Sequence, residues 1–354
     1  MSRFLTEKYK GLAPYTPGEQ PQDKKYVKLN TNESPFLPSE KAMELAKAEL
    51  SRLMLYPDPD VSALTKEIAE TYGVCENEVI VTNGSDEVLN FAFMAFCDKK
   101  TPAVFPDITY GFYKVFADLN GVPYTEIPLK DDFSVDTGAL MAADGVLFIA
   151  NPNAPTGMAL TASEIEEIVK SNKERVVVVD EAYVDFGAES AVPLTKKYSN
   201  LLVTMTFSKS RSMAGARLGF GIGQRELIDD LVRIKYSTNP YNVNRMTAAA
   251  GLGALLDREY FCENCRKIIE AREWTAGVLS SLGFELTPTR ANFIFAKSDK
   301  IGGEELYLSL KDRGVLVRHF KSPRIRDYVR ITVGSLEEME ILTDTIKEIL
   351  EAVK

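Results

Sequence analysis

The sequence of 354 residues contains a single histidine, His319, and only four cysteines. One histidine excludes any metal site built from several histidines. Four cysteines are too few for a disulfide framework in a chain of this length. Cys262 and Cys265 have a Cys-x-x-Cys spacing, but they fall in a long helical pattern with no preceding strand, so we expect a structural role for them.

Long apolar runs and an excess of positive charge are also missing. No run approaches the 18 apolar residues of a membrane span, and the first residues, MSRFLTEKYK, lack the apolar core of a signal peptide. The net charge of −9 argues against nucleic acid or an anionic membrane as the main partner. We therefore expect a cytoplasmic protein that binds neither nucleic acid nor membrane.

The chain does contain a regular alternation of apolar runs and helical patterns between about residues 78 and 223. The runs read EVIVT, PAVF, GVLFIA, RVVVVD, LLVTMTF and RLGFGIG. Short runs buried on both faces and joined by helices are typical of a mostly parallel α/β sheet. From about residue 224 the pattern becomes helical, and the last part of the chain reads as a small α+β unit.

The chain is longer than most single domains, so the sequence predicts more than one. We expect an extended N-terminal arm over residues 1–30, a large α/β domain over 31–260 and a small α+β domain over 261–354. The arm, which holds three prolines, is expected to pack on the small domain or on another subunit.

Ligands of open α/β sheets bind beyond the carboxyl ends of the strands, and polar residues follow several of these runs. EVIVT leads into Gly84, Ser85 and Asp86 and then a helix, which favours either a phosphate site or a simple helix cap. RVVVVD ends in Asp180, which either caps a loop or pairs with a buried cation. Lys209 follows LLVTMTF and, taken alone, reads as a solvated charge at a strand end.

Taken together, these pieces resemble one family over nearly the whole chain. The loop NPNAPTG at 151–157, Asp180 with Tyr183, and Lys209 with Arg217 are similar to fold type I pyridoxal-phosphate aminotransferases. The resemblance implies an α/β fold with a mostly parallel seven-stranded sheet and a smaller α+β domain. It also implies that Lys209 binds pyridoxal 5′-phosphate covalently.

The same resemblance implies roles for the residues around the cofactor. Asp180 would keep the ring nitrogen protonated, Tyr183 would bond the ring hydroxyl, and Lys209 would move the substrate proton. Many relatives have asparagine where this chain has Ala154, so Asn153 is expected to take over its contact, unless Tyr183 acts alone. The residues expected around the cofactor phosphate and ring face are Gly84, Ser85, Asp86, Tyr110, Thr206, Ser208 and Arg217.

Further segments, among them LNTNESPF, NPYNVN, GVLVR and YVRITVG, are similar to the histidinol-phosphate aminotransferase branch. That branch implies transamination of L-histidinol phosphate with 2-oxoglutarate, giving imidazole acetol phosphate and L-glutamate. It implies a homodimer in which Tyr56 reaches the cofactor phosphate of the opposite subunit. The residues expected at the substrate are Tyr15, Asn32, Arg318 and Arg330, the arginines because guanidinium groups bind phosphate in bidentate fashion.

Other interpretations of the sequence stay open. The donor could be an aromatic amino acid, the reaction could be that of a threonine-phosphate decarboxylase, or the chain could be a non-enzymatic binding protein of the same fold. Arg318 and Arg330 could be exposed strand charges, and Tyr15 and Tyr56 could be core or interface aromatics.

Overall fold

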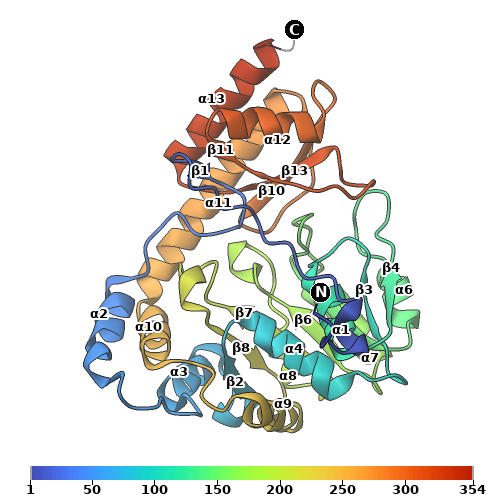
Figure 1. Cartoon of the computed structure of the whole chain (residues 1–354), viewed down its shortest axis with the longest axis vertical. Helices are drawn as coiled ribbons and strands as arrows, with labels where there is room; N and C mark the ends of the chain where they lie inside the picture. The colour runs from blue at the N-terminus through green and yellow to red at the C-terminus, as the bar shows by residue number, and fades with distance from the viewer. Residues whose placement is uncertain (1, 353–354) are drawn as a thin grey trace.

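A seven-stranded sheet forms the centre of the larger lobe in the computed structural model, which describes residues 2–352 (Figure 1). Five adjacent strands of this sheet run parallel to one another, and a sixth runs antiparallel to the strands on both of its sides. This confirms the mostly parallel seven-stranded sheet. Its spatial order is β2 (Val79–Thr82), β8 (Gly219–Ile222), β7 (Leu201–Thr206), β6 (Val177–Asp180), β5 (Val146–Ala150), β3 (Ala103–Pro106) and β4 (Tyr124–Ile127).

The central strands are apolar along their length because helices cover both faces of the sheet. Successive valines of β6 point to opposite faces, so Val177 and Val179 join one core cluster while Val178 joins the other. One face is covered by α4 (Ser85–Phe96), α5 (Phe112–Asn120) and α9 (Arg225–Thr238). The other is covered by α2 (Glu40–Ala48), α3 (Ser62–Tyr72), α6 (Thr137–Ala142), α7 (Ala162–Ser171), α8 (Val192–Thr195) and α10 (Arg245–Leu256).

β8 is glycine-rich because backbone from the neighbouring turn comes close to it. A Cβ on Gly219 would lie 2.2 Å from the backbone nitrogen of Ser85, so only glycine fits beside the start of α4. β4, at the sheet edge, was not among the runs identified from the sequence. Its residues are exposed or half-buried, so they lack the apolar run that marks the central strands.

The smaller lobe contains a four-stranded antiparallel sheet of order β12 (Arg318–His319), β13 (Tyr328–Thr332), β10 (Phe293–Ser298) and β9 (Phe284–Leu286). Its own core cluster joins these strands to three helices, α11 (Arg258–Ser281), α12 (Gly303–Asp312) and α13 (Leu336–Ala352). α11 is the long helix that runs between the two lobes (Figure 1). Cys262 and Cys265 lie in it as free thiols.

The N-terminal segment contacts both lobes. It begins with α1 (Glu7–Lys10), continues in extended form, and then forms β1 (Val27–Lys28), which pairs in parallel with β11 (Val315–Leu316) of the smaller lobe. The domain limits predicted above stay a prediction. Among the described residues, no helix has both the length and the apolar character of a membrane span. Short 3₁₀ turns complete the described elements: η1 (Leu50–Arg52), η2 (Glu76–Glu78), η3 (Val184–Phe186) and η4 (Ala214–Ala216).

Candidate active site

A cavity of about 590 Å³ lies where the carboxyl ends of β5, β6 and β7 meet the strands of the smaller lobe. The parallel strands bring their terminal loops to one edge, as expected for a ligand site of this kind of sheet. Thirteen of the predicted site residues line this active pocket: Tyr15, Asn32, Ser85, Asp86, Tyr110, Asp180, Tyr183, Thr206, Ser208, Lys209, Arg217, Arg318 and Arg330.

Lys209 lies in the turn after β7, with its amine inside the active pocket. Its Nζ donates a hydrogen bond to the backbone carbonyl of Thr31 at 3.1 Å, and it lies 5.9 Å from the ring centre of Tyr183. Burial, together with the charge of Arg330, lowers the pKa of this amine to about 8. A lysine with such a pKa can act as a nucleophile or base near neutral pH, because a sizeable fraction of it is uncharged.

Asp180 ends β6 at the floor of the active pocket and is buried. Its carboxylate accepts hydrogen bonds from the Tyr113 hydroxyl at 3.2 Å, the Thr204 hydroxyl at 3.3 Å and the Ala182 backbone N–H at 3.2 Å. Burial, with the nearby charge of Asp86, raises the pKa of Asp180 to about 6. A carboxylate placed in this way would be stabilised by a cationic partner in the cavity.

Tyr183 lies on the same turn as Asp180, three residues further along the chain. Its hydroxyl accepts a hydrogen bond from the side-chain amide of Asn32 at 2.9 Å, and its ring packs edge-on against Phe293 at 5.1 Å. Asn32 in turn accepts a bond from Thr332 of β13 at 3.0 Å. The N-terminal segment and the smaller lobe therefore hold the tyrosine hydroxyl at the cavity wall.

Groups suited to an anion gather at the start of α4. Arg217 contacts the Asp86 carboxylate at 3.0 Å and the Ser208 hydroxyl at 3.4 Å, and the Thr206 hydroxyl donates to Ser208 at 3.0 Å. Gly84, which precedes α4, has φ +83°, and a Cβ there would lie 2.7 Å from a nitrogen of Arg217. Glycine thus lets the guanidinium approach a helix N-terminus, where backbone N–H groups favour negative charge.

Asp86 takes part in a second contact at this end of the cavity. It accepts a hydrogen bond from the hydroxyl of Tyr110 at 2.7 Å. This bond fixes the Tyr110 side chain within the cavity wall, so that one carboxylate holds both the arginine and the tyrosine.

Arg318 and Arg330 enter the active pocket from neighbouring strands of the smaller lobe, where they are register partners. Arg318 donates to the carbonyls of Thr16 and Pro17 at 3.1 and 3.2 Å. Arg330 donates one bond, to the Asn30 carbonyl at 3.1 Å, and its Nε is buried with no partner among the described residues. Two guanidinium groups side by side, one with free donor capacity, can bind an anionic substrate group.

Three predicted residues, Gly84, Asn153 and Tyr56, are not among those that line this cavity, and Gly84 directly precedes the lining residue Ser85. The amide of Asn153 bonds Ile108 and Thr109 of the loop after β3 and Thr156 of its own loop, while Ala154 lines the cavity. The contact of Asn153 with the cofactor stays a prediction. Tyr56 is 77% exposed and stacks on Tyr241 at 4.6 Å, away from the cavity of its own chain.

Two contacts in the site had not been predicted from the sequence. Tyr113 lies in α5 within an ordinary helical pattern, and its hydroxyl reaches Asp180 only because of the way α5 packs on the sheet. The Thr31 carbonyl that accepts from Lys209 is a backbone group, which leaves no trace in the sequence. A tyrosine on the apolar face of an amphipathic helix is a sequence signal for the first contact, that of Tyr113 with Asp180, because a buried hydroxyl requires a hydrogen-bond partner.

Comparisons with known proteins agree with this geometry. The model of the family "Aminotransferase class I and II" matches residues 24–346. A protein of Brachyspira hyodysenteriae named histidinol-phosphate aminotransferase is 51% identical over 353 residues, which cover 99% of this chain and 100% of that protein. One of the same name from Clostridium botulinum is 47% identical over 99% of each chain.

Among solved structures, the histidinol-phosphate aminotransferase of Sinorhizobium meliloti in complex with pyridoxal-5′-phosphate superposes with a TM-score of 0.86. The match covers 94% of this chain and 93% of that one at 22% identity. At this identity the likeness establishes the fold, which is that of a fold type I enzyme.

Proposed function

Because the chain belongs to the family of class I and II aminotransferases, we propose that it transfers the amino group of L-histidinol phosphate to 2-oxoglutarate. The products would be imidazole acetol phosphate and L-glutamate, in histidine biosynthesis. The chain is a transferase, and its cofactor is pyridoxal 5′-phosphate. The observation that carries the choice of donor is 51% identity, across nearly the whole chain, to a protein named for that reaction.

The residues of the active pocket fit this cofactor. When bound, pyridoxal phosphate supplies an electron sink for the charge that develops when the amino-bearing carbon loses its proton. The buried Asp180 would pair with the ring nitrogen, and the hydroxyl of Tyr183 would bond the ring hydroxyl. Tyr110 would pack on the ring face. The group expected to hold the phosphate comprises Gly84, Ser85, Asp86, Thr206, Ser208 and Arg217, with Asp86 contributing its backbone.

Lys209 has two tasks in this proposal. It would bind the cofactor covalently through Nζ, and the same atom would remove the proton from the amino-bearing carbon and return it elsewhere. A pKa of about 8 suits both tasks, because about half of the amines are neutral at pH 8. Residues of both lobes and of the N-terminal segment line the cavity in which this proton transfer would take place.

The substrate phosphate would lie against Arg318 and Arg330, with Tyr15 and Asn32 nearby. Tyr15 stacks on Phe112 at 4.2 Å, at the cavity wall. The buried Nε of Arg330 has no partner among the residues described, and a phosphate oxygen would supply one. An unpaired buried donor costs on the order of 1–3 kcal/mol, so the binding of an anion there gains that amount back.

A comparison of histidinol phosphate with histidinol, which lacks the phosphate, tests this assignment. We expect Arg330→Ala to lower kcat/KM for histidinol phosphate roughly 10- to 100-fold, because a lost hydrogen bond between charged groups costs roughly 1.5–3 kcal/mol. For histidinol the change should stay within about threefold, since no phosphate is lost. Arg313→Ala is the control, since the side chain of this exposed arginine bonds the Ser309 carbonyl of its own helix and does not line the active pocket.

The same assay separates the alternatives. Mixed with the enzyme alone, histidinol phosphate should convert the cofactor to its amine form, and 2-oxoglutarate should then restore it with the release of glutamate. Faster conversion by phenylalanine or tyrosine would identify an aromatic aminotransferase instead. Release of carbon dioxide without any keto acid would identify a decarboxylase. An equal loss for histidinol and histidinol phosphate in Arg330→Ala would refute the placement of the phosphate.

We propose a homodimer with shared active sites, because Tyr56 is exposed and lies among the exposed apolar side chains of Leu53, Met54 and Leu55. Analytical ultracentrifugation should give twice the monomer mass. Mixing Lys209→Ala with Tyr56→Ala subunits should yield hybrid dimers that regain activity in one of their two sites. No regained activity in proven hybrids would rule out a shared site. The cytoplasmic location stays a prediction.

A further inference from the structure

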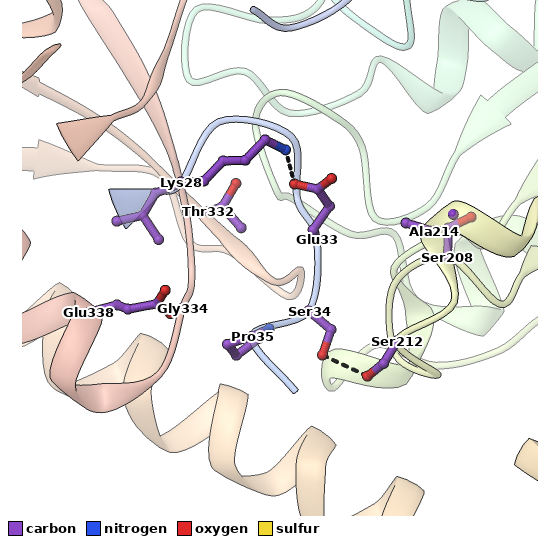
Figure 2. Close-up of a pocket in the computed structure, with 12 residues that line it drawn as sticks. Lys28, Glu33, Ser34, Pro35, Ser208, Ser212, Ala214, Thr332, Gly334 and Glu338 are labelled. Atoms are coloured by element: carbon purple, nitrogen blue, oxygen red, sulfur yellow. Dashed lines mark hydrogen bonds and ion pairs between the residues drawn. The ribbon is translucent and has the colours of Figure 1, made fainter. Parts of the chain in front are cut away.

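A second cavity of about 410 Å³ adjoins the active pocket (Figure 2). Three segments line it: the strap over residues 28–35, the turn over 208–215 that follows Lys209, and residues 332–338 of the smaller lobe. Glu33, Ser208 and Ala214 line both cavities. The strap and the lysine turn are therefore the wall between the two spaces, and none of the roles assigned above uses the second one.

Glu33 is the charged group in this shared wall. Its carboxylate pairs with Lys28 across the second cavity (Figure 2) and accepts a hydrogen bond from the Thr31 hydroxyl at 2.6 Å. The backbone carbonyl of the same Thr31 accepts the bond from Lys209. One residue of the strap thus connects Glu33, through its hydroxyl, with the active-site amine, through its carbonyl.

The strap is tied to the lysine turn at a second point. The hydroxyls of Ser34 and Ser212 are 2.8 Å apart and hydrogen-bonded (Figure 2). Ser212 has φ +58° and Asn32 has φ +55°, so both segments contain a residue in the left-handed region that non-glycine residues rarely adopt. Local strain of this kind persists only where surrounding contacts hold the backbone. The hydroxyl of Ser212 is bonded to Ser34, and the backbone of Asn32 donates to the Thr332 hydroxyl at 2.9 Å and accepts from the Asn292 amide at 3.1 Å.

We propose that Glu33 is a positioning residue for Lys209, holding the strap carbonyl against the amine and favouring the protonated amine by its negative charge. Glu33 lines the second cavity as well as the active pocket, and its side chain is 40% exposed. The proposal rests on the role of Lys209 in the proposed function, but its test does not require any substrate. In this proposal the protonation of Lys209 depends on Glu33 as well as on the residues expected to contact the cofactor.

The other charges around Lys209 do not make Glu33 redundant. Arg330 and Arg217 disfavour the protonated amine, and Asp86 favours it but is already paired with Arg217. Burial acts to raise the pKa of the Glu33 carboxyl group, but the hydrogen bonds from Lys28 and Thr31, together with the charges of Lys28 and Lys209, lower it overall and favour the ionised form. Glu338 lies on the opposite wall of the second cavity, with its carboxylate bonded to the Ser335 backbone N–H at 2.8 Å.

The experiment measures the proton affinity of Lys209 in the cofactor-free protein by competitive acetylation with trace acetic anhydride at a series of pH values, read by peptide mass spectrometry. In Glu33→Gln the midpoint for Lys209 should fall, with the protonated fraction at a fixed pH near the midpoint reduced about three- to tenfold. Glu338→Gln, the matched control from the same cavity, should leave the midpoint unchanged. Lys300, far from the site, serves as the internal reference.

Lys28→Met provides a second test, in which the titration midpoint of Lys209 should shift in the opposite direction. Removing the positive partner of Glu33 should raise the Lys209 midpoint, so this variant carries the test if Glu33→Gln does not fold. An unchanged midpoint in Glu33→Gln, an equal fall in Glu338→Gln, or no rise in Lys28→Met would each overturn the proposal. Absence of activity toward histidinol phosphate would refute the proposed donor but would leave these midpoints as they are.

Discussion

Lys209→Ala is expected to lower transamination by at least roughly 10²–10⁴-fold, the usual contribution of a positioned general acid–base group. The variant should also lose the covalent link, so that borohydride reduction no longer fixes the cofactor to the protein. The reason is that, among residues 2–352, two lysines line the active pocket, Lys209 and Lys114, and Lys114 is paired with Glu126 at 2.7 Å. Absorbance spectra and mass spectrometry after reduction measure the link, and the half-reaction with donor measures the rate.

Lys300→Ala is the control for that experiment. Lys300 also donates to a backbone carbonyl, that of Leu282 at 2.8 Å, but it is exposed and lies in the smaller lobe away from the active pocket. Its replacement should leave both the link and the rate unchanged. A Lys209→Ala protein that still carries reducible, covalently bound cofactor would contradict the assignment of Lys209.

Asp180→Asn is expected to slow the half-reaction by roughly 10²–10⁴-fold while the cofactor still binds covalently. Removing one partner of a buried ion pair costs roughly 3–5 kcal/mol, and each 1.4 kcal/mol in the barrier is a factor of ten. The amide would also meet hydroxyl donors that now bond both carboxylate oxygens, those of Tyr113 and Thr204. Stopped-flow absorbance of the donor half-reaction separates this rate from cofactor affinity.

Asp23→Asn is the matched control, because Asp23 also accepts a bond from a tyrosine hydroxyl, that of Tyr26 at 3.1 Å, but on the exposed arm. The Asp23→Asn variant should proceed through the donor half-reaction at the rate of the unmodified enzyme. If Asp180→Asn proceeded through the half-reaction at the unmodified rate, the pairing of Asp180 with the ring nitrogen would be wrong.

The parts of the site that the sequence predicted are those at strand ends. Asp180 and Lys209 each follow a buried parallel strand, and such strands bring their terminal residues to one edge whatever the details of packing. The backbone fixes where each strand ends, so the apolar pattern and the order of the strands were sufficient to predict that these side chains lie close together. The same reasoning identified the central strands, whose valine and leucine runs reflect burial on both faces.

The parts that the sequence did not predict depend on side-chain direction or on long-range pairing. Asn153 and Ala154 are neighbours in one loop, and which of them faces the cavity depends on hydrogen bonds to Ile108 and Thr109, far away in the chain. β4 lacks an apolar run because it lies at the sheet edge. The strap contacts Lys209 through the backbone carbonyl of Thr31, and such a contact cannot be predicted from the types of residue in the sequence.

The pairing of β1 with β11 has a consequence for how the protein is made. Val27 pairs with Val315, so the segment that leads into Asn32 must wait for a partner synthesised nearly 290 residues later. Contacts of such sequence separation form late, because the entropy of closing the loop must be overcome first. On a ribosome, all strands of the large sheet, which end at Ile222, are synthesised before β11. The strap behind Lys209 can therefore pair with β11 only after the whole sequence of the large sheet has been made.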